Sequence, residues 1–329
     1  MKKTDLLLGI FVISLIMTIT SCSTTTYLIQ ANNESFEQLT KITDIGKPCF
    51  GPNGGDNNEN LFFSVLDDGG YINIYRKSNA TLPAIYQKTF GNGLYLWPNY
   101  SRINDKLVFQ NYNGTSFNIF TLNATSKGKA ITSITTTSEN NYNPAWSPDG
   151  KKIIFEKGSA PREYIKTKRA NRRAIKYSKN VLSNQLWIKD LETGELKMIG
   201  VGSFPKFSPD SKFIAYVKYE LDKSDVVGTI WIMSSDGETN IKLTNVNTGY
   251  ATRPNWNPTS NTIIFQLTKR DKKDSDLYSI DISGENLKQY TTNKSNDFSP
   301  YWTSDGFIYF SSDRGDEKGK YQIWRFKVN

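Results

Sequence analysis

Residues 143–155 read Asn-Pro-Ala-Trp-Ser-Pro-Asp-Gly-Lys-Lys-Ile-Ile-Phe, and this stretch contains the unit from which most of the chain is built. The unit is a proline, a variable residue and an aromatic residue, then a turn, and then a hydrophobic strand. In the turn, Pro148 presets φ, Asp149 bonds to its own backbone, and Gly150 takes the left-handed conformation. The stretch therefore predicts two antiparallel strands joined by a tight turn.

The same unit occurs six times, with prolines 50, 46, 61, 49 and 46 residues apart. Its Pro-x-aromatic triplets are Pro48-Cys49-Phe50, Pro98-Asn99-Tyr100, Pro144-Ala145-Trp146, Pro205-Lys206-Phe207, Pro254-Asn255-Trp256 and Pro300-Tyr301-Trp302. A turn follows each triplet, and after the first one we assign it to Gly51-Pro52-Asn53-Gly54. The short fourth strands often end in a hydrophobic residue and a threonine: Leu39-Thr40, Ile134-Thr135, Leu243-Thr244 and Tyr290-Thr291. A period of 40–50 residues with four short strands is typical of a β-propeller blade.

We therefore predict an all-β fold, a six-bladed β-propeller of four-stranded antiparallel blades that start near residues 48, 98, 144, 205, 254 and 300. The last repeat has three strands but lacks a fourth. Ahead of the first repeat, residues 32–47 contain Phe36-Glu37-Gln38-Leu39-Thr40, which has the character of a strand. We expect this N-terminal segment to supply the missing strand, which would close the ring and remove two exposed sheet edges.

The repeat resembles that of the TolB-type six-bladed propeller, whose units read roughly Pro-x-Trp-Ser-Pro-Asp-Gly followed by Lys-Lys-Ile-x-Phe. Residues 143–155 match it nearly letter for letter, and the resemblance covers residues 32–329. TolB carries an extra α/β domain before its propeller, for which this sequence has no room. The resemblance implies a stand-alone propeller relative, and it says less about function, because one fold hosts many functions.

The N-terminus reads as an export signal. Lys2 and Lys3 precede an apolar run from Leu6 to Ile19, a length typical of a signal peptide. Ile19-Thr20-Ser21-Cys22 then resembles the bacterial lipobox. We predict a signal peptide over 1–21, a lipidated tether over 22–31 and acylation of Cys22; the alternative is an ordinary signal or membrane anchor with an incidental cysteine. By the sorting rules of such proteins, Ser23 is compatible with an outer-membrane lipoprotein that faces the periplasm.

Catalytic chemistry has little support in the residue types present. The chain contains no histidine, which excludes Ser-His-Asp and Cys-His catalysis and His-ligated zinc or iron sites. With Cys22 lipidated, Cys49 stands alone and we expect a packed structural thiol. We expect no cofactor, no metal site and no enzymatic activity. A glycosidase with paired carboxylates needs no histidine and stays an alternative, although no such pair stands out.

Most of the positive charge falls in one insertion. The chain has 41 basic and 32 acidic residues, a net charge of +9, and the stretch from Pro161 to Asn184 alone carries +7. The insertion, residues 158–184, separates the second and third strands of blade three and lengthens that repeat to 61 residues. Strand alternation places the loops between strands two and three on the same face as the connections between blades. A long basic loop of this kind is usually functional or disordered.

The insertion predicts a docking arm for an anionic partner on that face. The candidate partner-binding residues are Lys166, Lys168, Arg169, Arg172 and Arg173, together with Arg253 and Trp97 at the channel mouth. The other tryptophans fall at repeat positions, where packing between blades accounts for them. A solvated loop without a specific partner is the alternative reading.

The preferred function is that of a non-catalytic cell-envelope lipoprotein and protein-protein interaction scaffold. Its partner would be an envelope protein or an anionic cell-wall or lipid group, with membrane contact through the lipid anchor and no role for nucleic acid. The competing hypotheses are a binder of glycan or peptidoglycan fragments, a carbohydrate-active enzyme working in the central channel, and a purely architectural lipoprotein.

Overall fold

The computed structural model describes residues 37–56, 59–78, 84–112, 114–125, 130–159, 179–315 and 320–328. Several sequence predictions lie outside these residues and stay predictions: the signal peptide, the tether with Cys22, and the basic residues Lys166, Lys168, Arg169, Arg172 and Arg173.

The described chain forms twenty-four strands in six groups of four, of which five are consecutive in the sequence and the sixth joins the last three strands to the first. The first group is β2 (Cys49–Gly54), β3 (Leu61–Leu66), β4 (Ile72–Ser78) and β5 (Ala84–Gln87). The second is β6 (Leu94–Ser101), β7 (Lys106–Tyr112), β8 (Phe117–Asn123) and β9 (Ile131–Ser133). The third is β10 (Asn141–Trp146), β11 (Lys152–Lys157), β12 (Gln185–Asp190) and β13 (Leu196–Val201).

The fourth group is β14 (Ser203–Phe207), β15 (Phe213–Asp222), β16 (Asp225–Ser234) and β17 (Asn240–Lys242). The fifth is β18 (Tyr250–Trp256), β19 (Thr262–Thr268), β20 (Asp276–Asp281) and β21 (Lys288–Gln289). The sixth joins β22 (Asp297–Trp302), β23 (Phe307–Ser312) and β24 (Gln322–Lys327) to β1 (Glu37–Lys41). A short 3₁₀ helix, η3 (Lys179–Ser183), precedes β12, and another, η4 (Val246–Thr248), precedes β18. Neighbouring strands within each group are antiparallel, and one parallel pair between β4 and β6 joins the first two groups into one sheet.

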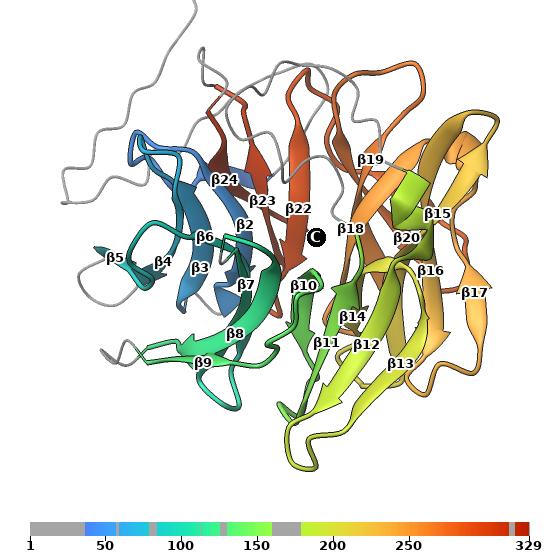
Figure 1. Cartoon of the computed structure of the whole chain (residues 1–329). Coiled ribbons are helices and arrows are strands. Elements are labelled where there is room, and N and C mark those ends of the chain that lie inside the picture. The colour runs from blue at the N-terminus through green and yellow to red at the C-terminus, as the bar shows by residue number, and fades with distance from the viewer. Residues whose placement is uncertain are drawn as a thin grey trace, which may run out of the picture.

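The six groups are the blades of a propeller. The first strands of successive blades contact one another in the order β2, β6, β10, β14, β18 and β22, and β22 contacts β2. In Figure 1 the colour accordingly runs round the molecule from blue through green and yellow to red, and the red strands lie beside the blue ones. The predicted all-β, six-bladed propeller of four-stranded antiparallel blades is confirmed.

The last blade combines strands from both ends of the described chain. Strand β1 pairs with β24, with Thr40 opposite Arg325 and Lys41 opposite Trp324. Just beyond this strand, the Ile42 N–H donates to the Ile323 carbonyl at 2.7 Å. The N-terminal strand therefore occupies the fourth position of the sheet β22–β23–β24–β1.

A threonine two residues beyond the fourth strand makes the same hydrogen bond in five blades. Its hydroxyl oxygen accepts a backbone N–H from the third strand at 2.8–2.9 Å. The five pairs are Thr89 with Ile74, Thr135 with Ile119, Thr244 with Ile230, Thr291 with Leu277, and Thr43 with Ile323. In the N-terminal segment Thr43 makes this hydrogen bond, not the predicted Thr40. The hydrophobic-threonine pair of this segment is therefore Ile42-Thr43.

The first repeat has a different register from the one predicted. The first strand of every blade contains a bulge. In blades two to six the first residue of the bulge lies directly before the proline and has φ between 49° and 55°. In blade one the bulge lies at Gly51 and Pro52, with φ 66° at Gly51. The prediction of a turn over 51–54 is therefore wrong, since these residues belong to β2, and Pro52 rather than Pro48 matches Pro98.

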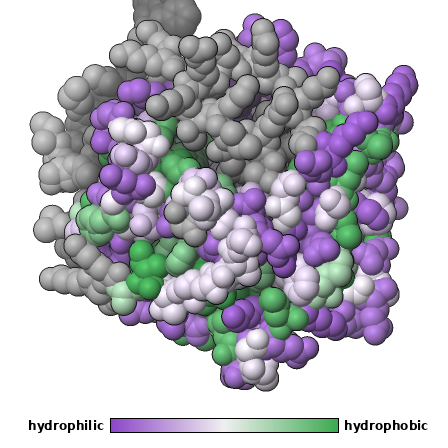
Figure 2. Space-filling model, in the orientation of Figure 1, coloured by the Kyte–Doolittle hydropathy of each residue, from purple (hydrophilic) through white to green (hydrophobic). Residues whose placement is uncertain are grey.

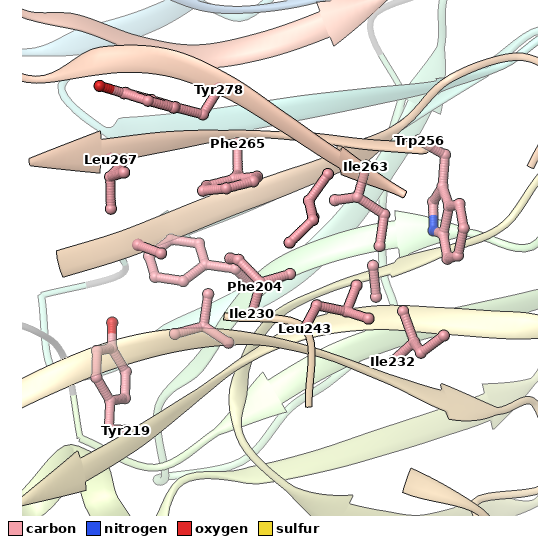
Figure 3. Close-up of a cluster of buried hydrophobic side chains, with 14 of the residues drawn as sticks. Phe204, Tyr219, Ile230, Ile232, Leu243, Trp256, Ile263, Phe265, Leu267 and Tyr278 are labelled. Atoms are coloured by element: carbon pink, nitrogen blue, oxygen red, sulfur yellow. The ribbon is translucent and has the colours of Figure 1, made fainter. Parts of the chain in front are cut away.

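Side chains from neighbouring blades interlock between the sheets. Figure 3 shows such a cluster between the fourth and fifth blades, where Phe204, Ile230 and Leu243 face Trp256 and Phe265. Burying each large apolar side chain contributes roughly 1.5–3 kcal/mol. Trp146, Trp256 and Trp324 are buried, and Trp187, Trp231 and Trp302 are half-buried, as expected of tryptophans that pack between blades.

Candidate functional site

Arg253 and Trp97 are in direct contact at the centre of the ring. Each is the first residue of its strand's bulge, Trp97 in β6 and Arg253 in β18, so they belong to blades two and five. Those blades are opposite each other in a ring of six. The Arg253 guanidinium carbon nevertheless lies 4.0 Å from the centroid of the Trp97 ring. The two side chains therefore span the central axis, an arrangement that their separation in the sequence does not reveal.

Two more aromatic rings surround the same guanidinium. Its carbon lies 5.1 Å from the ring of Phe204 in β14 and 5.7 Å from that of Phe298 in β22. Arg253 thus contacts an aromatic ring from each neighbouring blade and one from the opposite blade. Each such contact contributes about 0.5–2 kcal/mol, with the larger values where water is excluded. Arg253 and Trp97 are half-buried, and Phe204 is buried.

The bulge of blade one makes room for Trp97. A Cβ on Gly51 would lie 2.7 Å from Cε3 of Trp97, closer than van der Waals contact permits. Phe50 packs against the same indole, with ring centroids 5.5 Å apart. Gly51 is therefore required twice, for its positive φ and for the close approach of the indole.

Replacing Gly51 by alanine should lower the free energy of unfolding by about 1–3 kcal/mol and displace Trp97. Gly46→Ala is the matched control, because Gly46 has a similar φ of 69° but no atom within 4 Å of an added Cβ. Urea unfolding should show the smaller loss for Gly46→Ala, and tryptophan fluorescence of the folded protein should change only in Gly51→Ala. Equal effects in both variants would show that Trp97 does not need the space.

A second cation, Lys206, lies on the strand next to Arg253. It follows Phe204 by two residues in β14, and its backbone carbonyl accepts the Trp256 indole N–H at 2.9 Å. Burial, reinforced by the charge of Arg253, lowers the pKa of Lys206 to about 8. Near pH 7 the lysine is still mostly protonated, so two like charges share this part of the axis.

Glu156 connects this site to the basic insertion. Its carboxylate is fully buried at the end of the apolar strand Ile153-Ile154-Phe155. It accepts hydrogen bonds from the Asn143 side chain, the Asn184 side chain, the Ser203 hydroxyl and the Phe204 backbone N–H. Burial raises its pKa above the usual value, while these four donors act in the opposite direction. Its charge did not distinguish it in the sequence from a solvated strand residue, because lysines occupy both ends of the same strand.

Asn184 joins the two ends of the insertion. Its side-chain oxygen accepts the Ser159 N–H at 2.8 Å, and its amide donates to the Ser159 carbonyl at 2.9 Å. The same amide donates to Glu156, which holds the backbone of Phe204. Hydrogen bonds and ring contacts thus lead from the base of the basic insertion to Phe204, and from there to Arg253 and Trp97.

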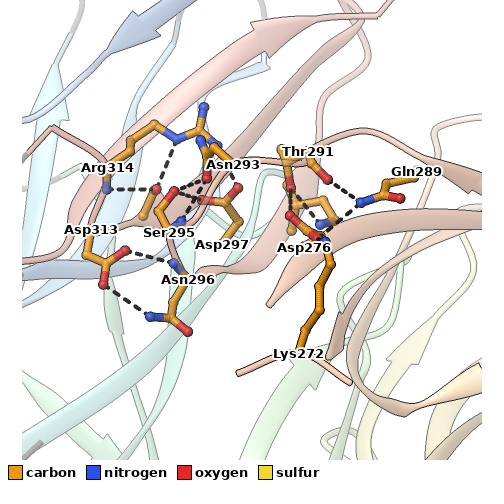
Figure 4. Close-up of polar contacts among 12 residues, drawn as sticks. Lys272, Asp276, Gln289, Thr291, Asn293, Ser295, Asn296, Asp297, Asp313 and Arg314 are labelled. Atoms are coloured by element: carbon orange, nitrogen blue, oxygen red, sulfur yellow. Dashed lines mark hydrogen bonds and ion pairs between the residues drawn. The ribbon is translucent and has the colours of Figure 1, made fainter. Parts of the chain in front are cut away.

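A network of polar side chains lies between blades five and six, around Asp276 and Asp297, the first residues of β20 and β22 (Figure 4). Asp297 and Arg314 form an ion pair at 2.5 Å in which both side chains are buried. Asp276 accepts bonds from Thr291, Gln289 and Lys272. Burial is the main reason that the pKa of Asp276 rises to about 7, against the opposing charge of Lys272 and with the help of Asp297. Sequence reasoning missed this network.

Two further expectations concern metals and thiols. Among the residues that the structure describes, no three His, Cys, Asp or Glu side chains are grouped as metal ligands would be. Cys49 is buried and free, and burial raises the pKa of its thiol to about 12, as expected of a packed thiol.

Within the described ranges, no helix has the length and hydropathy needed to cross a membrane.

A ring of six four-stranded blades with bulged first strands around a cationic and aromatic axis defines the class of this protein, a six-bladed β-propeller. The family described as TolB beta propeller domain matches residues 201–329. A protein designated TolB from Agrobacterium tumefaciens is similar over 86% of this chain and 91% of its own, with 16% identity and a TM-score of 0.57.

Enzymes share the fold as well. Oligogalacturonate lyase from Vibrio parahaemolyticus matches 93% of this chain and 97% of its own at 13% identity, with a TM-score of 0.59. A gluconolactonase from Xanthomonas campestris matches 89% of each chain at 9% identity, also with a TM-score of 0.59. At such low identities these similarities show the fold alone.

Proposed function

We propose that this protein is a non-catalytic interaction scaffold of the cell envelope, anchored through acylated Cys22, that binds an anionic envelope partner with one face of its propeller. One observation carries the proposal. The base of the basic insertion, at Ser159 and Asn184, is linked through Glu156 and Phe204 to the Arg253–Trp97 pair. The described base of the insertion is thus linked to the two axis residues, which supports the assignment of the insertion and the axis to one surface.

Recognition by charge also fits the character of the surface. On the face shown in Figure 2, apolar residues of the described chain form separate patches with polar residues between them. The exposed large apolar side chains include Leu196 and Met198 of β13, Ile241 of β17 and Ile131 of β9, which are fourth strands at the periphery. The basic side chains of the insertion would act mainly by raising the rate of association with an anionic partner. Binding should therefore weaken as the salt concentration rises.

The test is capture of envelope proteins by the full chain and by a charge-reversed variant. In that variant glutamate replaces Lys166, Lys168, Arg169, Arg172 and Arg173. The matched control reverses five exposed lysines on turns and strands away from the insertion: Lys106, Lys151, Lys197, Lys212 and Lys288. We expect the first variant to lose a salt-sensitive partner that the control retains. Identical capture by all three proteins would refute the docking role.

The anchor is tested independently. Labelled palmitate should be incorporated into the wild-type chain and not into Cys22→Ser, whose capture of the partner in detergent should be unchanged. Equal incorporation by both would show that Cys22 is not the acylated residue.

A further inference from the structure

A threonine hydroxyl marks one buried position of the third strand in four blades of the described chain. The hydroxyl that accepts a third-strand N–H also donates a hydrogen bond, and its acceptor is the side chain of the residue just before that N–H. The four pairs are Thr89 with Asn73 at 3.1 Å, Thr135 with Asn118 at 2.9 Å, Thr43 with Gln322 at 2.8 Å and Thr291 with Asp276 at 3.3 Å. All four acceptors are buried. Blade five therefore has a carboxyl group, which can ionise, where the three other blades have a neutral amide.

Asp276 shares its carboxylate among three donors (Figure 4). One oxygen accepts the Thr291 hydroxyl, and the other accepts the Gln289 amide at 3.1 Å and the Lys272 ammonium at 3.4 Å. The exposed fraction of the side chain is 2% for Asp276 and 34% for Lys272. The lysine can therefore turn toward water when the ion pair breaks, whereas the acid cannot.

Charged groups from several elements act on Asp276. Burial is the main reason that its pKa rises to about 7, while Lys272 opposes the rise, and Asp297 and Asp274 add to it. These groups lie on the loop before β20 (Lys272, Asp274) and on β22 (Asp297, which is paired with Arg314), and Tyr278 interacts with the charge from β20 itself. Asp276 therefore changes between its neutral and ionised forms near neutral pH.

The loop that contains Lys272, residues 269–275, joins β19 to β20. Near one end, the Arg270 guanidinium is hydrogen-bonded to blade four. At the other end, the Ser275 hydroxyl is hydrogen-bonded to side chains of β19 at 2.9 and 3.0 Å. Neither contact involves Asp276. Between these two ends, the ion pair of Lys272 with Asp276 holds the middle of the loop.

We propose that Lys272 and Asp276 form a pH-sensitive latch on blade five, in which ionised Asp276 holds the loop 269–275 against the blade and protonated Asp276 releases it. A protonated carboxyl still offers an acceptor to Thr291, as the amide oxygens do in the other blades. It no longer attracts the Lys272 ammonium, whose charge is then better solvated by water. The latch involves no partner, so it does not depend on the proposed scaffold role.

Cleavage by trypsin tests the latch, because the loop contains Lys269, Arg270, Lys272 and Lys273. The full chain in detergent is digested at pH 6 and at pH 8, and mass spectrometry measures cleavage after Arg270. Each rate is divided by that of a free peptide of the same sequence at the same pH, which removes the pH dependence of trypsin itself. A pKa of about 7 for Asp276 predicts relative cleavage at least about fivefold faster at pH 6 than at pH 8. Equal relative rates at the two pH values would overturn the proposal.

Two substitutions should abolish this pH dependence. Asp276→Asn gives blade five the amide that blades one and two have, and Lys272→Met removes the cation. In both variants the loop should be cleaved at pH 8 as fast as at pH 6, within twofold. Lys273→Met and Asp271→Asn, at exposed positions of the same loop, are the matched controls and should keep the wild-type dependence. A wild-type pH dependence in Asp276→Asn or in Lys272→Met would contradict the assignment.

Global stability gives a second readout, and its sign is opposite. Burial raises the pKa of Asp276 in the folded protein to about 7, from about 4 in the unfolded chain, so ionisation of this carboxyl disfavours the fold. In urea unfolding, the stability of the wild type relative to Asp276→Asn should therefore fall as the pH rises from 4 to 7 and level off above 8. Faster cleavage of the loop at pH 6 would then not reflect general unfolding. A stability difference that is the same at every pH would show that Asp276 does not titrate in this range.

Discussion

Replacing Arg314 by methionine should lower the free energy of unfolding at pH 7 by about 3–5 kcal/mol, the largest single effect that we expect in this protein. The exposed fractions of the Arg314 and Asp297 side chains are 5% and 0%, so the substitution leaves a carboxylate buried without its cation. The arginine also donates from Nε to the Ser312 hydroxyl, and its guanidinium lies 4.9 Å from the ring of Phe310. Urea unfolding monitored by circular dichroism measures the loss.

The pH dependence of the stability loss shows whether the unpaired Asp297 carboxylate causes it. Burial already raises the pKa of Asp297 in the folded state, and removing Arg314 should raise it further. A carboxyl with a raised folded pKa loses stability as the pH rises from its unfolded value of about 4. The penalty of Arg314→Met should therefore be smaller at pH 4 than at pH 7. A penalty independent of pH would indicate lost packing rather than an unpaired charge.

Two further variants serve as controls for Arg314→Met. Arg270→Met breaks the Arg270–Asp222 pair, whose side chains are 34% and 27% exposed, and should cost no more than about 1 kcal/mol. The double variant Arg314→Met/Asp297→Asn should be more stable at pH 7 than Arg314→Met alone, because no uncompensated charge remains buried. If the double variant is less stable instead, the pairing argument fails.

Replacing Glu156 by alanine should destabilise the protein by about 3 kcal/mol. Its carboxylate accepts bonds from Asn143, Asn184, Ser203 and the Phe204 N–H, so alanine removes the acceptor of four buried hydrogen bonds. Hydrogen exchange should report faster opening at Ser159 and Phe204, the two backbone positions that depend on this cluster. Urea unfolding gives the accompanying change in stability.

Glu192→Ala is the comparison for Glu156→Ala. Glu192 is an exposed carboxylate paired with Lys151, and its removal should change stability by no more than about 0.5 kcal/mol. Should Ser159 and Phe204 retain wild-type exchange rates in Glu156→Ala, the proposed connection between the insertion and the axis would not exist.

The register error in blade one shows where local sequence is ambiguous. Gly-Pro-Asn-Gly at 51–54 is a good turn sequence, because glycine provides a positive φ and proline a fixed one. A β-bulge uses the same two conformations, and the structure uses them for the bulge of β2. Counting from Pro52 makes the first interval 46 residues, like the second, and regular spacing was the signal that could have corrected the assignment.

The candidate site was predicted in part. The sequence indicated that Arg253 and Trp97 share a face, and the structure brings them into contact across the axis. It did not indicate Lys206, which reads as one variable position among six, or the buried acids Glu156 and Asp297. A charged residue in a strand is equally compatible with a solvated position until the packing of the neighbouring blade is known.

Periodicity was sufficient for the number of blades, the order of their strands and the position of the N-terminal strand, because a proline, a turn and a hydrophobic run act through neighbours along the chain. The cationic axis depends instead on the curvature of the closed arrangement of blades, which brings bulge residues from opposite blades within contact distance. Local conformational preferences can be read from one segment at a time. The pairing of Arg253 with Trp97, and of Glu156 with its four donors, exists only once the blades have packed together and excluded water.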